Sequence, residues 1–334
     1  MGEILAWALS PDGRHLAVGT DPGDDYYGGG ELQVWELATG HRINVLRGIP
    51  GGISFISDRE MPGRLRWHPA GKLVGAVFDT NRVGLFDPFG HSAHPLGALD
   101  LTDGWGRGPG WCFSPAGNQI AVSCYTDTTI PLFVASVYTT GFGKVRTLGP
   151  RSPGALVVPL EELDWSTDLR RIAGFGQEVH VIDMETEELT TTSWTAPAAF
   201  APDGRTLARV DGSLLSIGDA VTVDLLGAAA MSVHWSPDGR RLAVLTDVGA
   251  VVLEASGRQV REIAGTPVVA GAAFDAGGER LALLIDGRLQ VWGPGGRVFD
   301  AAAGPETVGV EIAGPAVVGI GPEELRFHLI GDLL

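Results

Sequence analysis

One short pattern occurs twice in the chain, more than two hundred residues apart. It reads LSPDGRHLAVGTD at residues 9–21 and WSPDGRRLAVLTD at residues 235–247. Weaker copies lie between and beyond these two, and self-similarity at a regular interval is the signature of a repeat architecture. A large apolar residue stands two positions before the Pro of the SPDG turn, or at the matching place, in every copy: Leu9, Trp67, Phe113, Trp165, Phe200, Trp235, Phe274 and Ile312.

Each copy predicts a hairpin of two antiparallel strands. A turn follows the apolar position, and in SPDG the Ser, the φ-restricted Pro and the final Gly favour a type I turn. A short apolar strand comes next, for example HLAVGT, LVGAVF, LAVLTD or LALLID. We expect the first hairpin turns, including those with Pro11, Pro115, Pro202 and Pro237, to lie on one face of the protein.

Two further strands follow in most copies. A third strand with alternating polar and apolar residues ends near Trp35, Phe86, Phe133, Ile182, Ile217, Leu253, Trp292 and Phe327. Seven copies continue into a fourth strand, as at residues 41–48, 144–149 and 258–265. Only LIGDLL remains after Phe327.

Four short strands in a repeat of roughly 40 residues predict an all-β fold, a β-propeller of four-stranded antiparallel blades. Eight copies favour eight blades with the last one incomplete, and seven blades is the alternative. We expect residues 1–334 to form a single propeller domain. The apolar positions should be core, so Trp67, Phe113, Trp165, Trp235 and Phe274 should occupy equivalent places and be nearly fully buried.

The repeats resemble the WD-repeat family across nearly the whole chain. The resemblance is carried by SPDG-L-A and by Trp35-Glu36, Phe86-Asp87, Ile182-Asp183 and Trp292-Gly293 at the third strands; TolB-like propellers share the SPDG part. No intact Trp-Asp dipeptide is present, and the Gly-His pair that the family carries between blades is missing at that place, so the sequence resembles a divergent, bacterial-type member. The family's Asp between second and third strands is matched by Asp79, Asp127, Asp211, Asp247 and Asp286.

The charge of the chain restricts its partners. The formal net charge is -16 and the pI is about 4.8, whereas binding to nucleic acid or to an anionic membrane requires clustered Lys and Arg. We expect a neutral or basic protein or peptide partner, no nucleic acid and no membrane. The first residues lack a basic segment followed by an apolar one, so a cytoplasmic location is expected.

Candidate metal and redox sites are weak. Cys112 and Cys124 are the only cysteines, too few for a zinc cage, and we interpret them as small buried residues in preference to a redox pair. His91 and His94 could supply two metal ligands but have no third one nearby in sequence. No cofactor is therefore expected.

Calcium is a second metal alternative. Asp21, Asp24, Asp25 and Glu31 carry the oxygen ligands that calcium prefers, but their spacing matches no calcium loop, and a solvated acidic turn is the other interpretation.

Long connections predict where function lies. In an up-and-down blade, the connection between the second and third strands shares a face with the link to the next blade. Long insertions on this face, at residues 21–30, 49–64, 98–110 and 149–161, all fall in the first half of the chain. They contain residue types that are enriched at interface hot spots, and the candidate partner-binding residues are Asp24, Asp25, Tyr26, Tyr27, Arg59, Arg64, Trp105, Arg107 and Arg151.

Two function hypotheses follow from these observations. The first is a non-catalytic scaffold that holds a protein or peptide on the face with the long loops, since no catalytic motif is found. The alternative is a hydrolase-like or lactonase-like propeller enzyme, or a small-ligand binder, that uses acidic groups in a central channel, with or without calcium.

A chelator distinguishes a calcium site from a solvated acidic turn. Because no ligand set reaches the number that a structural site requires, EDTA should leave the melting temperature unchanged in a thermal melt followed by circular dichroism. A large decrease would instead support calcium at Asp21, Asp24 and Asp25.

Overall fold

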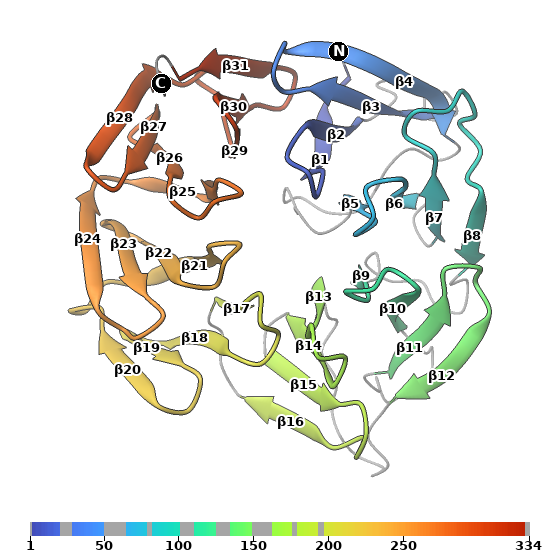
Figure 1. Ribbon diagram of the computed structural model, residues 1–334, viewed down its shortest axis with the longest axis horizontal. Helices are drawn as coiled ribbons and strands as arrows, with labels where there is room; N and C mark the ends of the chain where they lie inside the picture. The colour runs from blue at the N-terminus through green and yellow to red at the C-terminus, as the bar shows by residue number, and fades with distance from the viewer. Residues whose placement is uncertain are drawn as a thin grey trace. The chain divides into compact units, whose positions relative to one another are not determined.

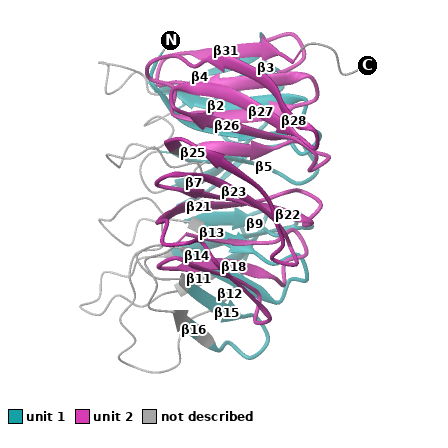
Figure 2. Cartoon of the chain, turned by 90° about the vertical axis from the view of Figure 1, so that its left-hand side faces the viewer, with its two compact units in different colours: residues 1–36, 41–194 teal, residues 37–40, 195–334 magenta. Residues whose placement is uncertain are grey.

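The structure is a computed structural model that describes residues 2–20, 29–49, 65–78, 82–100, 110–124, 134–148, 162–175, 179–192 and 197–330. Within these ranges, every regular element is a β-strand. The chain divides into two compact units, which Figure 2 colours separately: unit 1 is residues 1–36 and 41–194, and unit 2 is residues 37–40 and 195–334.

Unit 1 contains four blades, each a meander in which every strand pairs antiparallel with the next. Figure 1 shows that the first strand of each blade lies on the inner side of this unit and the fourth on the outer side. The strands are β1 (Ile4–Leu9), β2 (His15–Thr20), β3 (Gly30–Glu36), β4 (His41–Ile49); β5 (Leu65–Trp67), β6 (Val74–Phe78), β7 (Arg82–Phe86), β8 (Gly97–Asp100); β9 (Trp111–Phe113), β10 (Gln119–Cys124), β11 (Val134–Thr139), β12 (Lys144–Leu148); β13 (Glu162–Trp165), β14 (Arg171–Phe175), β15 (Val179–Asp183) and β16 (Leu189–Thr192).

Unit 2 contains four more blades built in the same way, and the last of them has three strands. A parallel bridge between Ala270 and Gly309 joins the last two blades into one seven-stranded sheet. The strands are β17 (Ala198–Phe200), β18 (Leu207–Asp211), β19 (Leu214–Ile217), β20 (Val221–Asp224); β21 (Ala230–Trp235), β22 (Arg241–Thr246), β23 (Gly249–Glu254), β24 (Gln259–Ala264); β25 (Pro267–Phe274), β26 (Leu281–Ile285), β27 (Arg288–Gly293), β28 (Gly296–Ala302); β29 (Gly309–Ala313), β30 (Ala316–Ile320) and β31 (Leu325–Leu329).

The eight sequence repeats are thus eight blades, and the fold is an all-β propeller whose last blade is incomplete. The prediction of eight blades over seven is confirmed. The predicted fourth strands at residues 41–48, 144–149 and 258–265 correspond to β4, β12 and β24.

The repeated apolar residue ends the first strand in seven blades, as predicted. In the eighth, Ile312 is followed by one more strand residue, and Gly314 and Pro315 make the turn. Trp67, Phe113 and Trp165 are buried, with 7%, 9% and 4% of their surface exposed. Trp235 and Phe274 are only half-buried, so near-complete burial was correct for three of the five residues.

Two of the three tryptophans in this position, Trp67 and Trp235, also bond to the preceding blade. The indole N–H of Trp67 donates to the Ala8 carbonyl at 2.9 Å, and that of Trp235 donates to the Ala199 carbonyl at 3.0 Å. Ala8 and Ala199 each lie one residue before the equivalent apolar position of the blade before. The ring therefore adds a hydrogen bond between blades to the area that it buries, and the residues are part of the core.

The third strand of the third blade differs from the prediction. Phe133 was expected near the end of this strand, but β11 begins only at Val134. Tyr138 takes the equivalent place: it is opposite Ile120, which is opposite Phe113, just as Trp35 is opposite Leu16. The strand starts later because the connection from β10 spans residues 125–133.

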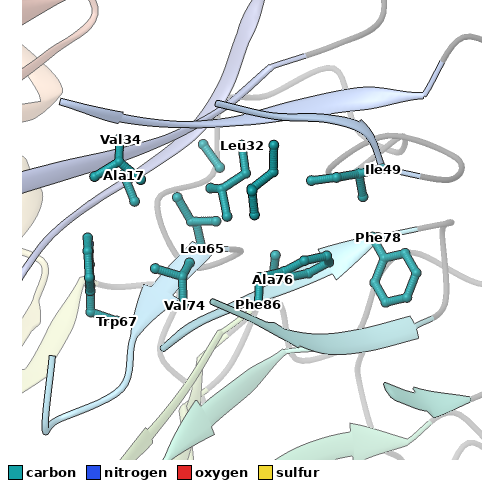
Figure 3. Close-up of a cluster of buried hydrophobic side chains, with 12 residues drawn as sticks. Ala17, Leu32, Val34, Ile49, Leu65, Trp67, Val74, Ala76, Phe78 and Phe86 are labelled. Atoms are coloured by element: carbon teal, nitrogen blue, oxygen red, sulfur yellow. The ribbon is translucent and has the colours of Figure 1, made fainter. Parts of the chain in front are cut away.

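Burial between neighbouring blades forms the core. Between the first two blades, Ala17, Leu32 and Val34 point toward Leu65, Trp67, Val74 and Phe86, and all are buried (Figure 3). The second and third blades also pack closely, because a Cβ on Gly75 would collide with the Trp111 ring.

The first hairpin turns lie side by side within each unit, on what we call the turn face. In unit 1, a Cβ on Gly71 would lie 4.0 Å from Pro11, and the His68 ring bonds the Gly117 carbonyl at 2.8 Å. In unit 2, Arg241 donates to the Gly278 carbonyl at 3.3 Å, and Arg280 donates to the Gly314 carbonyl at 2.7 Å. For these turns, the prediction of a common face is confirmed within each unit taken separately.

The same hydrogen bonds recur inside the turns. Ser10 Oγ donates to Asp12 Oδ1 at 2.6 Å and accepts the His15 N–H at 2.9 Å, while the Gly13 N–H donates to the Ser10 carbonyl at 2.8 Å. Gly13 has a φ of 67°. The turn is thus the predicted type I turn, followed by a residue in the left-handed region that favours glycine.

The STDL turn of the fourth blade places a leucine in this position. Leu169 has a φ of 62° and is 45% exposed. A left-handed conformation costs a non-glycine residue about 1–2 kcal/mol, less the larger entropy that glycine loses on folding. We expect Leu169→Gly to stabilise the protein by roughly 0.5–1 kcal/mol, measured as an increased midpoint of urea unfolding.

The reciprocal change is the control. Gly71 has a φ of 70° and room for a Cβ, so Gly71→Leu should lower the midpoint. If both variants unfold at the wild-type midpoint, backbone conformation at this position does not limit stability.

Candidate interaction surface

The surface predicted to bind a partner is the face opposite the turn face, which we call the link face. It carries the links between blades and the connections between second and third strands. All nine candidate residues, Asp24, Asp25, Tyr26, Tyr27, Arg59, Arg64, Trp105, Arg107 and Arg151, lie outside the described residues. The predicted loop boundaries need correction at their ends, because Gly30 belongs to β3, Ile49 to β4 and residues 98–100 to β8.

Ion pairs mark the bases of two of these loops. In the first blade, Arg47 Nε lies 2.9 Å from Glu31 Oε1, and in the second, Arg82 lies 3.2 Å from Asp100. Each pair joins directly opposed residues of the third and fourth strands. Arg47, Arg82 and Asp100 were not among the predicted site residues, although opposite charges flank the predicted hairpins in the sequence. Exposed pairs of this kind contribute at most about 1 kcal/mol each and give the base of the surface a mixed charge.

Of the four residues proposed as calcium ligands, the structure describes Glu31, and its carboxylate already has partners. Glu31 pairs with Arg47 and accepts a hydrogen bond from Gln33 at 2.9 Å, while Asp21, Asp24 and Asp25 lie outside the described residues. His91 and His94 are exposed in the turn between β7 and β8. Among the residues that the structure describes, no three His, Cys, Asp or Glu side chains are grouped as a metal site would require.

Short links in unit 2 are fixed by an aspartate from the same blade. Asp247 Oδ1 accepts the Ala229 N–H at 2.9 Å, and Asp286 Oδ1 accepts the Thr266 N–H at 2.8 Å. The backbone N–H of each aspartate donates back to the carbonyl of the same link residue, at 2.9 Å and 3.0 Å. The predicted position of Asp247 and Asp286 between second and third strands is confirmed, and their role is structural.

Local hydrogen bonds favour the charged form of several described carboxyl groups. The hydroxyl of Ser10 holds the pKa of Asp12 below its usual value, and that of Ser236 does the same for the pKa of Asp238. Each described carboxyl group with a displaced pKa is shifted downward. Burial raises the pKa of the free Cys112 thiol to about 12, so this cysteine is a small buried core residue, as expected.

Arg66, on an inner strand of unit 1, has a structural role. Arg66 on β5 donates to the Leu163 carbonyl on β13 at 3.0 Å. It therefore ties two inner strands together.

Comparison with known proteins identifies the fold. No protein-family model matches the chain, and no curated protein does. Sqt1 from Chaetomium thermophilum is similar over 99% of this chain and 97% of its own, with a TM-score of 0.69 and 18% identity. The same protein bound to the N-terminus of ribosomal protein L10 matches over 98% and 97%, with a TM-score of 0.67 and 18% identity.

A third similar structure is the Cps50 (Swd1) β-propeller domain from Myceliophteria thermophila, covering 98% of this chain and 96% of that one, with a TM-score of 0.58 and 15% identity. At these identities the likeness concerns the fold, which is a WD40-like β-propeller. Among the described residues, none forms a helix of the length and apolarity needed to span a bilayer.

The aspartate that fixes a link can be tested directly. Asp247→Ala removes the acceptor of the Ala229 N–H and should cost roughly 1–2 kcal/mol, whereas Asp247→Asn keeps an acceptor oxygen and should cost less. The midpoint of urea unfolding measures both. Asp219→Ala removes an exposed aspartate of the turn face and should change little; equal losses in all three variants would contradict a specific role for Asp247.

Proposed function

We propose that this protein is a non-catalytic interaction scaffold that binds a protein or peptide on the link face of unit 1. The observation that carries the proposal is the uneven length of the connections on that face. In unit 1 the long connections span residues 21–29, 50–64, 101–110, 125–133 and 149–161, and two short ones span 79–81 and 176–178. In unit 2 the links span residues 225–229, 265–266 and 303–308, and in its first three blades the connections between second and third strands span 212–213, 247–248 and 286–287. The stretch 125–133 adds a long connection to the four that the sequence predicted. Stability alone requires no such difference, and long surface loops on a rigid scaffold commonly carry binding function.

The fold supports a scaffold in general terms. One similar structure, Sqt1, holds the N-terminus of a ribosomal protein, and another, Swd1, is likewise a β-propeller. Stacked blades suit the presentation of loops to a partner, since the loops can vary while the sheets keep their packing.

We further propose that Tyr26, Tyr27, Trp105 and Arg107 are the anchors, with Asp24, Asp25, Arg59, Arg64 and Arg151 around them. Tyr, Trp and Arg provide the largest binding energies at protein interfaces. A chain with a net charge of -16 favours a neutral or basic partner through electrostatic steering. A single propeller domain in the cytoplasm, from a divergent bacterial-type WD-repeat lineage, completes this proposal.

The anchor proposal predicts a loss of binding without a loss of fold. Replacing Tyr26, Tyr27, Trp105 and Arg107 together with Ala should weaken partner capture at least about tenfold, equivalent to 1.4 kcal/mol. The partner is first identified by affinity purification from the native host, and its affinity is then measured by surface plasmon resonance. The melting temperature should stay within a few degrees of wild type, since none of the four belongs to the repeated core pattern.

A matched variant on the turn face provides the control. Arg14, His91, His94 and Arg170 are exposed there, and their joint replacement with Ala should leave capture intact. Wild-type capture by the anchor variant would place the binding surface elsewhere, and unfolding of that variant would mean that the anchors are core residues.

A further inference from the structure

A cavity of about 140 Å³ opens between the fifth and sixth blades, within unit 2. It is bounded by the end of β20 and the link after it on one side, and by the start of β23 and the facing part of β24 on the other. Its buried lining includes Leu225, Thr246, Ala250 and Ile263. The volume far exceeds the space that one water requires, so the cavity can hold a side chain of several atoms.

The two blades separate only at the link face. At the other end of β20, a Cβ on Gly257 would lie 3.1 Å from Val223 and closer still to Val221, so the sixth blade packs tightly there. The cavity therefore lies on the link-face side of this close contact. Its mouth shares the link face with Asp247 and the connection to β23.

Two exposed apolar residues stand at the mouth. Leu226 is 87% exposed and Val248 is 61% exposed, and both line the cavity. Leu226 has a φ of 57°, in the left-handed region. The loop holds it there through a 2.8 Å bond from its N–H to Asp224 Oδ1, so an apolar side chain is kept in water at an energetic cost. Strained positions of this kind are concentrated at functional sites.

Two carboxylates complete the lining. Asp224 and Glu262 are exposed and line the same cavity. Their partners are neutral groups: Glu262 accepts from the Gln259 amide at 3.4 Å, and Asp224 accepts from the Leu226 N–H at 2.8 Å and from the Ser213 hydroxyl at 3.3 Å. Neither forms an ion pair with a cation of the described residues. The cavity thus combines aliphatic walls with negative charge that no described cation balances, in a protein of net charge -16.

From these features we infer that the cavity binds a lysine or arginine side chain of a partner peptide, an inference that rests on the proposed scaffold function and extends it to unit 2. The aliphatic stem of such a side chain lies along Leu226 and Val248, and the cationic end reaches Asp224 and Glu262. Lysine and arginine combine an apolar stem with a charged head, and charge-assisted hydrogen bonds to carboxylates are stronger than neutral ones. A wholly apolar side chain would bring no positive charge to either carboxylate.

The test uses the full chain and two small probes. N-acetyl-lysine N-methylamide and its uncharged norleucine counterpart are titrated while the backbone amide signals of Leu226, Val248 and Ile263 are followed by NMR. The lysine probe should shift all three signals, bind at least about tenfold more tightly than the norleucine probe, and bind more weakly as salt is added.

Charge-removing variants locate the interaction. Asp224→Asn with Glu262→Gln keeps the bond to the Leu226 N–H but removes both charges, and should weaken lysine binding at least about tenfold. Asp219→Asn with Glu279→Gln removes the same charge from the turn face of unit 2 and should leave binding within about twofold of wild type. An equal loss in both double variants would reduce the effect to attraction by net charge and overturn the inference.

Other outcomes would also overturn it. Equal binding of the norleucine probe would show that the cavity selects an apolar side chain. If neither probe shifts the amide signals, the cavity does not bind a cationic side chain. A concentration-dependent dimer in sedimentation velocity that Leu226→Glu abolishes would make a second copy of the chain the occupant. The titration requires no native partner, and the four anchor residues of unit 1 are unchanged in it, so its failure is distinct from a failure of the proposed scaffold function.

Discussion

The structure depends on the burial of both faces of each blade against its neighbours. The second strands VGAVF, LALLI and AVVGI are buried at every position. A single blade would leave these residues in water, and repeat units of this kind are stable only when stacked. The inner strands must therefore stay apolar and closely packed. Variation is tolerated in the connections, and that is where both proposed binding sites lie.

Much of the fold could be predicted because its signals are local and repeated. The apolar residue, the turn and the second strand follow one another within a few residues, so the register of the first hairpin was recovered in seven blades. The third strand was less predictable. Phe133 and Tyr138 are both large and apolar enough to end it, and only pairing with Ile120 distinguishes them. Leu169 shows a different difficulty. The turn of the fourth blade forms although a leucine occupies the left-handed position that favours glycine.

The sites were harder to predict for a different reason. The position of Asp247 follows from the repeat, but its partner, the Ala229 N–H, depends on how the link folds back. Leu226 reads as an ordinary loop residue, because a left-handed backbone at a leucine has no sequence signal. The cavity beside it is made by two blades whose contributing residues, from Val223 to Ile263, come together only when the sheets pack.

The parallel bridge between Ala270 and Gly309 has a consequence for local unfolding. Among the described strands, each of the other blades is a separate hydrogen-bonded sheet, but the last two blades share one sheet of seven strands. A three-stranded blade at the end of an array would otherwise be its weakest segment. Opening of the last blade would break this bridge and expose the inner edge of its neighbour. We therefore expect the last two blades to open together, as one unit of local unfolding.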